Sequence, residues 1–318
     1  MFGFRIGHLL CRREVEMILS SQVSAVITSA GSRPKELRLA IESVRNQSTS
    51  VGEIILVWDC PKSESNKIIF DREGIQEFYT EVPFSGPSTT RNIGIMQSSK
   101  DFISFLDDDD LWFPKKIEKQ LEIVNQDGNT NKIIIANCLF IDQSYKIIGR
   151  SGNFLRNSSE IISLKKMYRN LPIKSGKIYI PTSSIFMAKQ LAVENLFNID
   201  LKIAEDIEFM LRNSSQQNVI RISTPLVLTL IRKKNRNGQT YDGFELKKWI
   251  NSIMSMPVLE SREKGNILLY FGTKRLLYLL GIQKSTLYFI KNLRNGSDIT
   301  TIKSTFVHLI AYFFRNDK

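Results

Sequence analysis

The first 125 residues alternate between two kinds of segment, and this alternation limits the fold more than any other feature. "VSAVITS" (23–29) predicts a buried strand, and "PKELRLAIESVRNQ" (34–47) carries apolar residues three and four positions apart, as an amphipathic helix does. Further segments of the same kinds are strands at 53–59, 75–82 and 101–107 and a helix at 116–124. This succession predicts an α/β domain with a mainly parallel sheet covered by helices.

The fourth strand runs into an acidic sequence, "FLDDDDLWFPKK". The four carboxylates of Asp107 to Asp110 repel one another and need a positive partner if they leave water. A helix N-terminus explains one or two of them, since Pro114 suits the first helical position and Asp110 could cap free amides. A divalent cation explains the others, because Mg²⁺ and Mn²⁺ prefer oxygen ligands. In parallel sheets, ligands bind beyond the carboxyl ends of strands, where Asp59 and Asp107 are expected.

The composition of the chain limits the size of its core, the compartment in which it is expected and the kind of partner it binds. With 318 residues, 42% of them hydrophobic, the chain can bury a substantial core. Its three cysteines are widely spaced and form no zinc or redox motif, which indicates a reducing compartment. Charges interrupt every apolar run in the first 22 residues, so we expect a cytoplasmic protein without a secretory signal or membrane span there. The net charge of +12 points to an acidic partner: nucleic acid, anionic lipid or phosphorylated substrates.

The remainder of the chain predicts more strands and then a basic helical region. Strands are expected at 132–142, 179–187 and 219–233, and a helix at 204–215. From about Lys264, apolar and aromatic residues are interleaved with Lys and Arg, and two interpretations stay open. These helices could pack on the α/β core, or they could lie on the anionic inner face of the cell membrane. The predicted division is an N-terminal extension, a core domain and a C-terminal basic amphipathic region, at 1–22, 23–245 and 246–318.

Five motifs in register give the sequence a likeness to a known family. They are "VSAVITSAGSRPKELRLAIESVRNQS", "EIILVWDC", "GPSTTRNIGI", "FLDDDDLWFPKKIEKQ" and "AEDIEFMLR". Across residues 23–235 the chain resembles family 2 glycosyltransferases, which are inverting, nucleotide-sugar-dependent enzymes of the GT-A fold. The resemblance implies a GT-A, Rossmann-like sheet flanked by helices, with the core domain as catalytic domain and a C-terminal helical extension.

The resemblance also implies roles for single residues. Asp109, with Asp107 beside it, would bind Mn²⁺ or Mg²⁺, and Asp206 would be the base that takes the acceptor proton, with Glu205 shaping the site. The implied donor-binding residues are Thr28, Arg33, Asp59, Arg91, Asp107 and Asp108. Two alternatives stay open: Arg91 could instead form a salt bridge to the acidic run, and the acid pair could simply stabilise a helix start.

The chain departs from the family pattern in two places. Many members carry a histidine near the end of the catalytic domain that helps to bind metal or phosphate, whereas the histidines here are His8 and His308. "LIRKKNRNGQ" (230–239) occupies the corresponding region, so the basic residues at 232–234 are candidates to contact the diphosphate. The "QxxRW" motif and the membrane spans of the processive synthases are absent, which favours the addition of a single sugar.

The predicted function is transfer of one hexosyl-type sugar, with inversion, from a nucleotide sugar to a hydroxyl of a cell-surface glycan. A UDP-sugar donor is favoured, and the acceptor is expected to be lipopolysaccharide, capsule or a similar glycan on a lipid carrier. A metal-dependent nucleotidyl or phosphoryl transferase is the nearest alternative enzyme, and a catalytically silent scaffold of the same fold also fits the pattern. Nucleic acid is not an expected partner, because four aspartates repel phosphate and the basic residues match no recognition motif.

Overall fold

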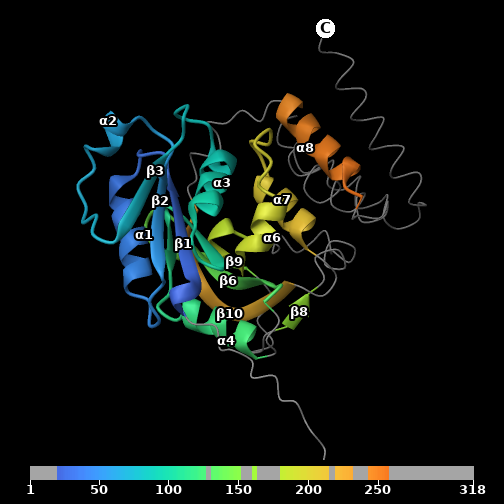
Figure 1. Cartoon of the computed structure of the whole chain (residues 1–318), viewed down its shortest axis with the longest axis horizontal. Helices are drawn as coiled ribbons and strands as arrows, with labels where there is room; N and C mark the ends of the chain where they lie inside the picture. The colour runs from blue at the N-terminus through green and yellow to red at the C-terminus, as the bar shows by residue number, and fades with distance from the viewer. Residues whose placement is uncertain are drawn as a thin grey trace, which may run out of the picture.

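The computed structural model describes residues 20–126, 130–151, 160–162, 180–214, 219–231 and 243–257. Within them one ten-stranded sheet has the order β3-β2-β1-β4-β9-β6-β10-β5, with β7 beside β6 and β8 beside β10 (Figure 1). The strands are β1 (Val23–Ser29), β2 (Glu53–Trp58), β3 (Ile75–Tyr79), β4 (Phe102–Asp107), β5 (Asp110–Trp112), β6 (Ile133–Ile141), β7 (Ile147–Arg150), β8 (Glu160–Ile162), β9 (Ile185–Ala188) and β10 (Val219–Leu230). The helices are α1 (Pro34–Arg45), α2 (Lys62–Ser65), α3 (Pro87–Gln97), α4 (Lys116–Asn125), α6 (Lys189–Glu194), α7 (Glu205–Asn213) and α8 (Gly243–Ser255), with 3-10 turns η1 (Ser20–Gln22) and η2 (Thr182–Ser184).

The expected parallel sheet is present in the first four strands. β1 pairs in parallel with both β2 and β4, and β2 pairs in parallel with β3. The register places Thr28, near the end of β1, opposite Asp107 at the end of β4 and opposite Val57 on β2. The carboxyl ends of these strands therefore share one edge of the sheet, which is the edge where a ligand site was predicted.

Beyond β4 the sheet is mixed, so the expectation of a mainly parallel sheet holds for only half of it. β9 runs antiparallel to both β4 and β6, while β6 runs parallel to β10. β5 is separated from β4 by only two residues, and it pairs with β10 at the far end of the sheet rather than with β4. Such a short connection cannot make the crossover that a strand parallel to β4 would require, so β5 is not a parallel neighbour of β4.

Two apolar cores form, one on each face of the sheet. α1 and α4 pack on one face, and α3, α6 and α7 pack on the other (Figure 1). The predicted helical face of α1 is confirmed, because its buried residues are Leu37, Ala40, Ile41 and Val44. On the opposite face α3 approaches β1 closely at Gly94, where a Cβ atom would lie 2.2 Å from a methyl group of Val26. A side chain at Gly94 would therefore push α3 away from the sheet.

The described part of the C-terminal region packs on the same α3–α7 core. α8 crosses the boundary predicted between residues 245 and 246, and Trp249 and Ile253 are fully buried in that core. Residues 1–19 and 258–318 lie outside the described residues, as do the basic residues at 232–234 and most of 151–177. The division into three regions therefore stays a prediction. Among the described helices, none has the length and apolar character needed to cross a bilayer.

Candidate active site

The acidic run folds into a tight turn between β4 and β5 that separates its four aspartates. The side chains of Asp107 and Asp109 are 32% and 20% exposed, whereas the side chain of Asp108 is 1% exposed and Asp110 is 3% exposed. Asp110 lies in β5, opposite Thr229 of β10, and α4 begins six residues later at Lys116. The interpretation of Asp110 as a helix cap is therefore wrong, because the chain continues as a strand before the helix starts.

Two arginines supply the positive charge that the acidic run needs. Arg33 contacts Asp108 at 2.8 Å and also forms an ion pair with Asp109. Arg91 donates to both carboxylate oxygens of Asp107, at 2.9 and 3.1 Å, and its other terminal nitrogen donates to Glu205 at 2.9 Å. The salt bridge between Arg91 and the acidic run, left open by the sequence, is thus present in the structure.

Burial and ion pairing set the charge states at this edge. Burial raises the pKa of Asp108 to about 7, although Arg33 and a hydrogen bond from Ser29 act in the opposite direction. Burial acts to lower the pKa of Arg91, but the charges of Asp107 and Glu205 outweigh it and raise the pKa above its usual value. Arg91 is therefore a fixed positive charge held between two carboxylates.

The predicted acid pair opens α7, and Arg91 connects it to the acidic turn. Ala204, just before the pair, has a φ of 50°, a left-handed conformation that is unusual for a residue with a side chain. This bend brings Glu205 to Arg91, while Oδ1 of Asp206 accepts the backbone N–H of Ile207 at 2.8 Å. The pair lies at a helix start, as one alternative proposed, and it also lies at the predicted site.

Thr28 and Asp59, two predicted donor-binding residues, differ in their surroundings. The hydroxyl of Thr28 lies 3.4 Å from a carboxylate oxygen of Asp107, at the carboxyl edge. Asp59 is 7% exposed and accepts the backbone N–H groups of Ser85 and Gly86, at 2.8 and 2.7 Å, and the hydroxyl of Thr80 at 3.1 Å. Asp59 therefore holds the turn that leads into α3, and its contact with a nucleotide base stays a prediction.

Two serines in contact with the acidic turn were missed by the sequence reasoning. Ser29 donates to Asp108 at 2.6 Å, and the side-chain oxygen of Ser183 accepts the backbone N–H of Asp107 at 3.1 Å. The only signal for Ser183 is the small polar run in "PTSS", inside a segment predicted as a strand at 179–187. That segment contains the 3-10 turn η2 followed by β9, so the strand begins later than predicted.

The partly exposed carboxylates of Asp107 and Asp109 fit a divalent cation that is shared with a substrate. In the ranges that the structure describes, no three His, Cys, Asp or Glu side chains are grouped as a metal site. A Mg²⁺ or Mn²⁺ ion that also binds phosphate usually needs only one or two carboxylates from the protein. Asp107 and Asp109 provide such oxygen ligands with part of their side chains exposed, whereas Asp108 and Asp110 are buried. The donor contact of Asp108 stays a prediction.

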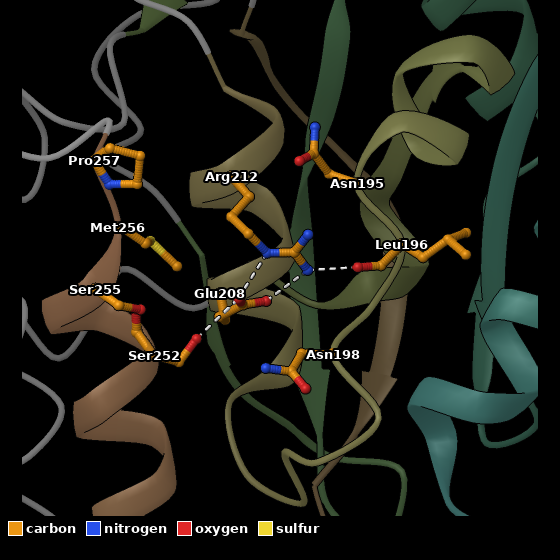
Figure 2. A pocket seen from close by; sticks show the side chains of 9 residues that line it. All are labelled: Asn195, Leu196, Asn198, Glu208, Arg212, Ser252, Ser255, Met256 and Pro257. Atoms are coloured by element: carbon orange, nitrogen blue, oxygen red, sulfur yellow. Dashed lines mark hydrogen bonds and ion pairs between the residues drawn. The ribbon is translucent and has the colours of Figure 1, made fainter.

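A separate pocket lies between α7, α8 and the segment that precedes α7 (Figure 2). It has a volume of about 480 Å³ and contains none of the predicted site residues. Arg212 donates to both oxygens of Glu208, at 2.6 and 2.8 Å, and Ser252 of α8 donates to the same carboxylate at 3.0 Å. These bonds tie α8 to the helix that carries the acid pair.

Similar proteins are named as glycosyltransferases, and similar structures have been solved for S. aureus TarS. An uncharacterized glycosyltransferase of Rickettsia bellii is 28% identical over 233 residues, which are 73% of this chain and 32% of that protein. This chain thus spans about a third of that relative's length. The putative teichuronic acid biosynthesis glycosyltransferase TuaG of Bacillus subtilis is 29% identical over 132 residues, which are 40% of this chain and 48% of that protein. S. aureus TarS, solved in complex with UDP-GlcNAc, has a TM-score of 0.60 at 13% identity, covering 81% of this chain and 73% of that chain.

A second TarS structure, solved in complex with UDP, has a TM-score of 0.58 at 15% identity and covers 78% of this chain and 70% of that chain. These structures confirm the GT-A fold. The family assignment comes from the sequence itself. The model of glycosyl transferase family 2 matches residues 24–197, which is more than half of the 318 residues. The match includes the acidic turn, Arg33 and Arg91, and it ends shortly before the acid pair of α7. The chain belongs to glycosyl transferase family 2.

Proposed function

We propose that this protein transfers a single hexosyl-type sugar, with inversion, from a nucleotide sugar to a hydroxyl group of a cell-surface glycan. The proposal rests on one observation: the acidic turn, two arginines and the acid pair of α7 meet at the carboxyl edge of the parallel strands. A UDP-sugar is the favoured donor, because the structural neighbour TarS has been solved with UDP and with UDP-GlcNAc. The name of TuaG supports a surface polysaccharide as the acceptor.

The acidic turn and the arginines form the donor side of this site. Asp109, with Asp107 beside it, would hold Mn²⁺ or Mg²⁺, which supplies positive charge to stabilise the nucleoside diphosphate as it leaves. Arg33 and Arg91 can contact the nucleotide or its phosphates, since both lie at this edge and remain protonated. Without a donor, the same arginines offset the repulsion between the carboxylates.

The acid pair forms the acceptor side. In an inverting transfer, the attacking hydroxyl approaches the anomeric carbon opposite the leaving group and must lose its proton. Asp206 is the proposed base. Glu205 acts beside it through Arg91, which also bonds Asp107. Donor side and acceptor side are therefore joined by one buried guanidinium, and Glu205 keeps the start of α7 next to the acidic turn.

The acceptor glycan is proposed to be lipid-linked and to be reached from the cytoplasmic face of the membrane. The support is the C-terminal sequence, where aromatic and basic residues are interleaved from about Lys264 onward. Full-length protein is expected to co-sediment with vesicles containing phosphatidylglycerol and not with purely zwitterionic vesicles. Equal sedimentation with both kinds of vesicle would contradict the membrane part of the proposal.

Isothermal titration with UDP, GDP, ADP, CDP and UDP-GlcNAc, in Mn²⁺ and then in EDTA, tests the donor assignment. One nucleotide is expected to bind in Mn²⁺ and to lose its affinity in EDTA. The substitution Asp109→Ala should weaken that binding by about 10–100-fold, which is the usual cost of losing a charged contact of 1.5–3 kcal/mol.

The matched control is Asp101→Ala, which removes an exposed aspartate just before β4, at the opposite edge of the sheet. This variant should bind the nucleotide as the wild type does. Equal affinity of the wild type and Asp109→Ala in Mn²⁺ would contradict the assignment of Asp109 as a metal ligand.

A further inference from the structure

Ser183 contacts both ends of the acidic turn, although it is 76 residues away from Asp107 in the sequence. Its side-chain oxygen accepts the backbone N–H of Asp107 at 3.1 Å, and its hydroxyl donates to the carboxylate of Asp110. Its carbonyl oxygen accepts the indole N–H of Trp112 at 3.1 Å. One residue of η2 therefore bonds the last residue of β4 and two of the three residues of β5.

The contact with Asp107 occurs where β4 has lost its neighbour in the sheet. β9 pairs with β4 only over Phe102 to Ser104, so the ladder on this side ends three residues before Asp107. A buried N–H group without a partner is costly, and the side chain of Ser183 takes the place that a strand would otherwise fill. This bond determines where the backbone of Asp107 leaves the sheet, and hence where its carboxylate lies.

The surroundings of Ser183 leave the turn little freedom to shift. Ser183 is fully buried, and Asp110 and Trp112 are each 3% exposed. Under the indole ring of Trp112 lies Nζ of Lys116, 4.1 Å from the ring centroid. This nitrogen donates to the hydroxyl oxygen of Ser104 at 2.5 Å and to the side-chain oxygen of Gln120 on α4 at 2.9 Å. The turn therefore rests on a packed, hydrogen-bonded base formed by β4, β5, η2 and α4.

We infer that Ser183 is a positioning residue for the donor site: it holds the β4–β5 turn so that Asp107 and Asp109 face the same cation and diphosphate. The inference rests on the proposed function, because it assigns to Ser183 an effect on donor binding. Ser183 itself is fully buried and touches neither ligand, so it acts only through Asp107 and Asp110. Groups that orient metal ligands in this way typically change metal affinity by about 10–100-fold when they are lost.

The test measures UDP binding by full-length protein at increasing Mn²⁺ concentration, for Ser183→Ala and for the matched control Ser184→Ala. Ser184 is equally buried, but its hydroxyl donates to the carbonyl of Pro181 and does not touch the turn. Ser183→Ala should raise the Mn²⁺ concentration at half-maximal UDP binding about tenfold. Ser184→Ala should leave it unchanged, even if thermal melts of the two metal-free variants show a similar loss of stability.

Three results would contradict the inference. If Ser183→Ala requires no more Mn²⁺ than the wild type, the residue does not position the donor site. If Ser184→Ala shifts the Mn²⁺ requirement as much as Ser183→Ala, the effect is general loss of stability in η2. If the wild type binds no UDP in Mn²⁺, the proposed UDP-sugar function itself fails and the inference falls with it.

Discussion

Carboxylates with hydrogen-bond or ion-pair partners lie at both edges of the same parallel strands, and their partners differ. At the amino edge, Glu53 at the start of β2 is 9% exposed, and its hydrogen-bond partners are neutral. It accepts hydrogen bonds from the hydroxyl of Ser24 at 2.6 Å, from the backbone and side chain of Ser99 at 2.7 and 2.8 Å, and from Gln76 at 3.2 Å. At the carboxyl edge, Asp107, Asp108 and Asp109 are held mainly by arginines.

The difference indicates which edge maintains the fold and which edge can exchange partners. Ser24 and Ser99 have short side chains on packed elements, so the hydrogen bonds of Glu53 form as the fold forms. An arginine has a long side chain and a permanent charge, and it can turn from a carboxylate to a phosphate without loss of charge pairing. We therefore expect changes at the amino edge to alter stability and changes at the carboxyl edge to alter ligand binding and turnover.

The largest effect is expected for Asp206→Asn at the carboxyl edge. An amide of the same shape cannot accept the acceptor proton, so the turnover number should fall by about 10²–10⁴-fold. The affinity for the donor nucleotide and the thermal midpoint should stay near the wild-type values, because the fold and the acidic turn are unchanged. Steady-state kinetics with titration of the donor measures both, and a variant with unchanged turnover would exclude Asp206 as the base.

A smaller effect, on stability alone, is expected for Glu53→Gln at the amino edge. Replacing the carboxylate by an amide removes a charged acceptor from buried hydroxyl and amide donors, which should cost about 1–3 kcal/mol in the free energy of unfolding. Urea unfolding measures this cost, with Glu42→Gln as control because Glu42 is an exposed member of a surface ion pair on α1. Nucleotide affinity should be unchanged, and weakened binding would contradict the division between the two edges.

The smallest effect is a pH dependence of the contribution that Glu53 makes to the free energy of unfolding. Burial acts to raise the pKa of Glu53, but hydrogen bonds from Ser24 and Ser99 outweigh it, so the pKa in the folded protein lies below its usual value of 4.5. The unfolded chain therefore binds the proton more readily. The stabilisation is present above about pH 4.5 and is lost as the pH falls through the lowered native pKa.

This pH dependence is measured as the difference in unfolding free energy between the wild type and Glu53→Gln. The difference should be constant from pH 7 to about pH 5 and should shrink in stronger acid. Other carboxylates titrate in both proteins and largely cancel in the difference. A difference that grows as the pH falls would mean that the native pKa of Glu53 is raised rather than lowered.

Local patterns predicted the parallel half of the fold well. The apolar strand and the helical spacing in 23–47 correspond to β1 and α1, and the helix expected at 116–124 is α4 at Lys116–Asn125. The mixed half of the sheet was harder to predict from the sequence, since β5 is only three residues long and its partner β10 lies more than a hundred residues later. No local periodicity reports such a pairing.

The candidate site shows the same limit. The acidic run and the acid pair were identified from their motifs, and Arg91 was expected to contact either the donor or the acidic run. That Arg91 joins Asp107 to Glu205 depends on how α3, which carries Arg91, packs on the sheet, and spacing in the sequence does not determine that packing. Ser183 was missed for a related reason, because its role depends on where β9 stops pairing with β4.

The central claim is that the carboxyl edge exchanges its arginine contacts for a donor and a cation. The most direct test is a crystal structure with UDP and Mn²⁺, with data collected at the manganese absorption edge. We expect an anomalous peak at the carboxylates of Asp109 and Asp107, next to the diphosphate, with Glu53 still bonded to Ser24 and Ser99. Bound UDP with the manganese peak away from both aspartates would contradict the account.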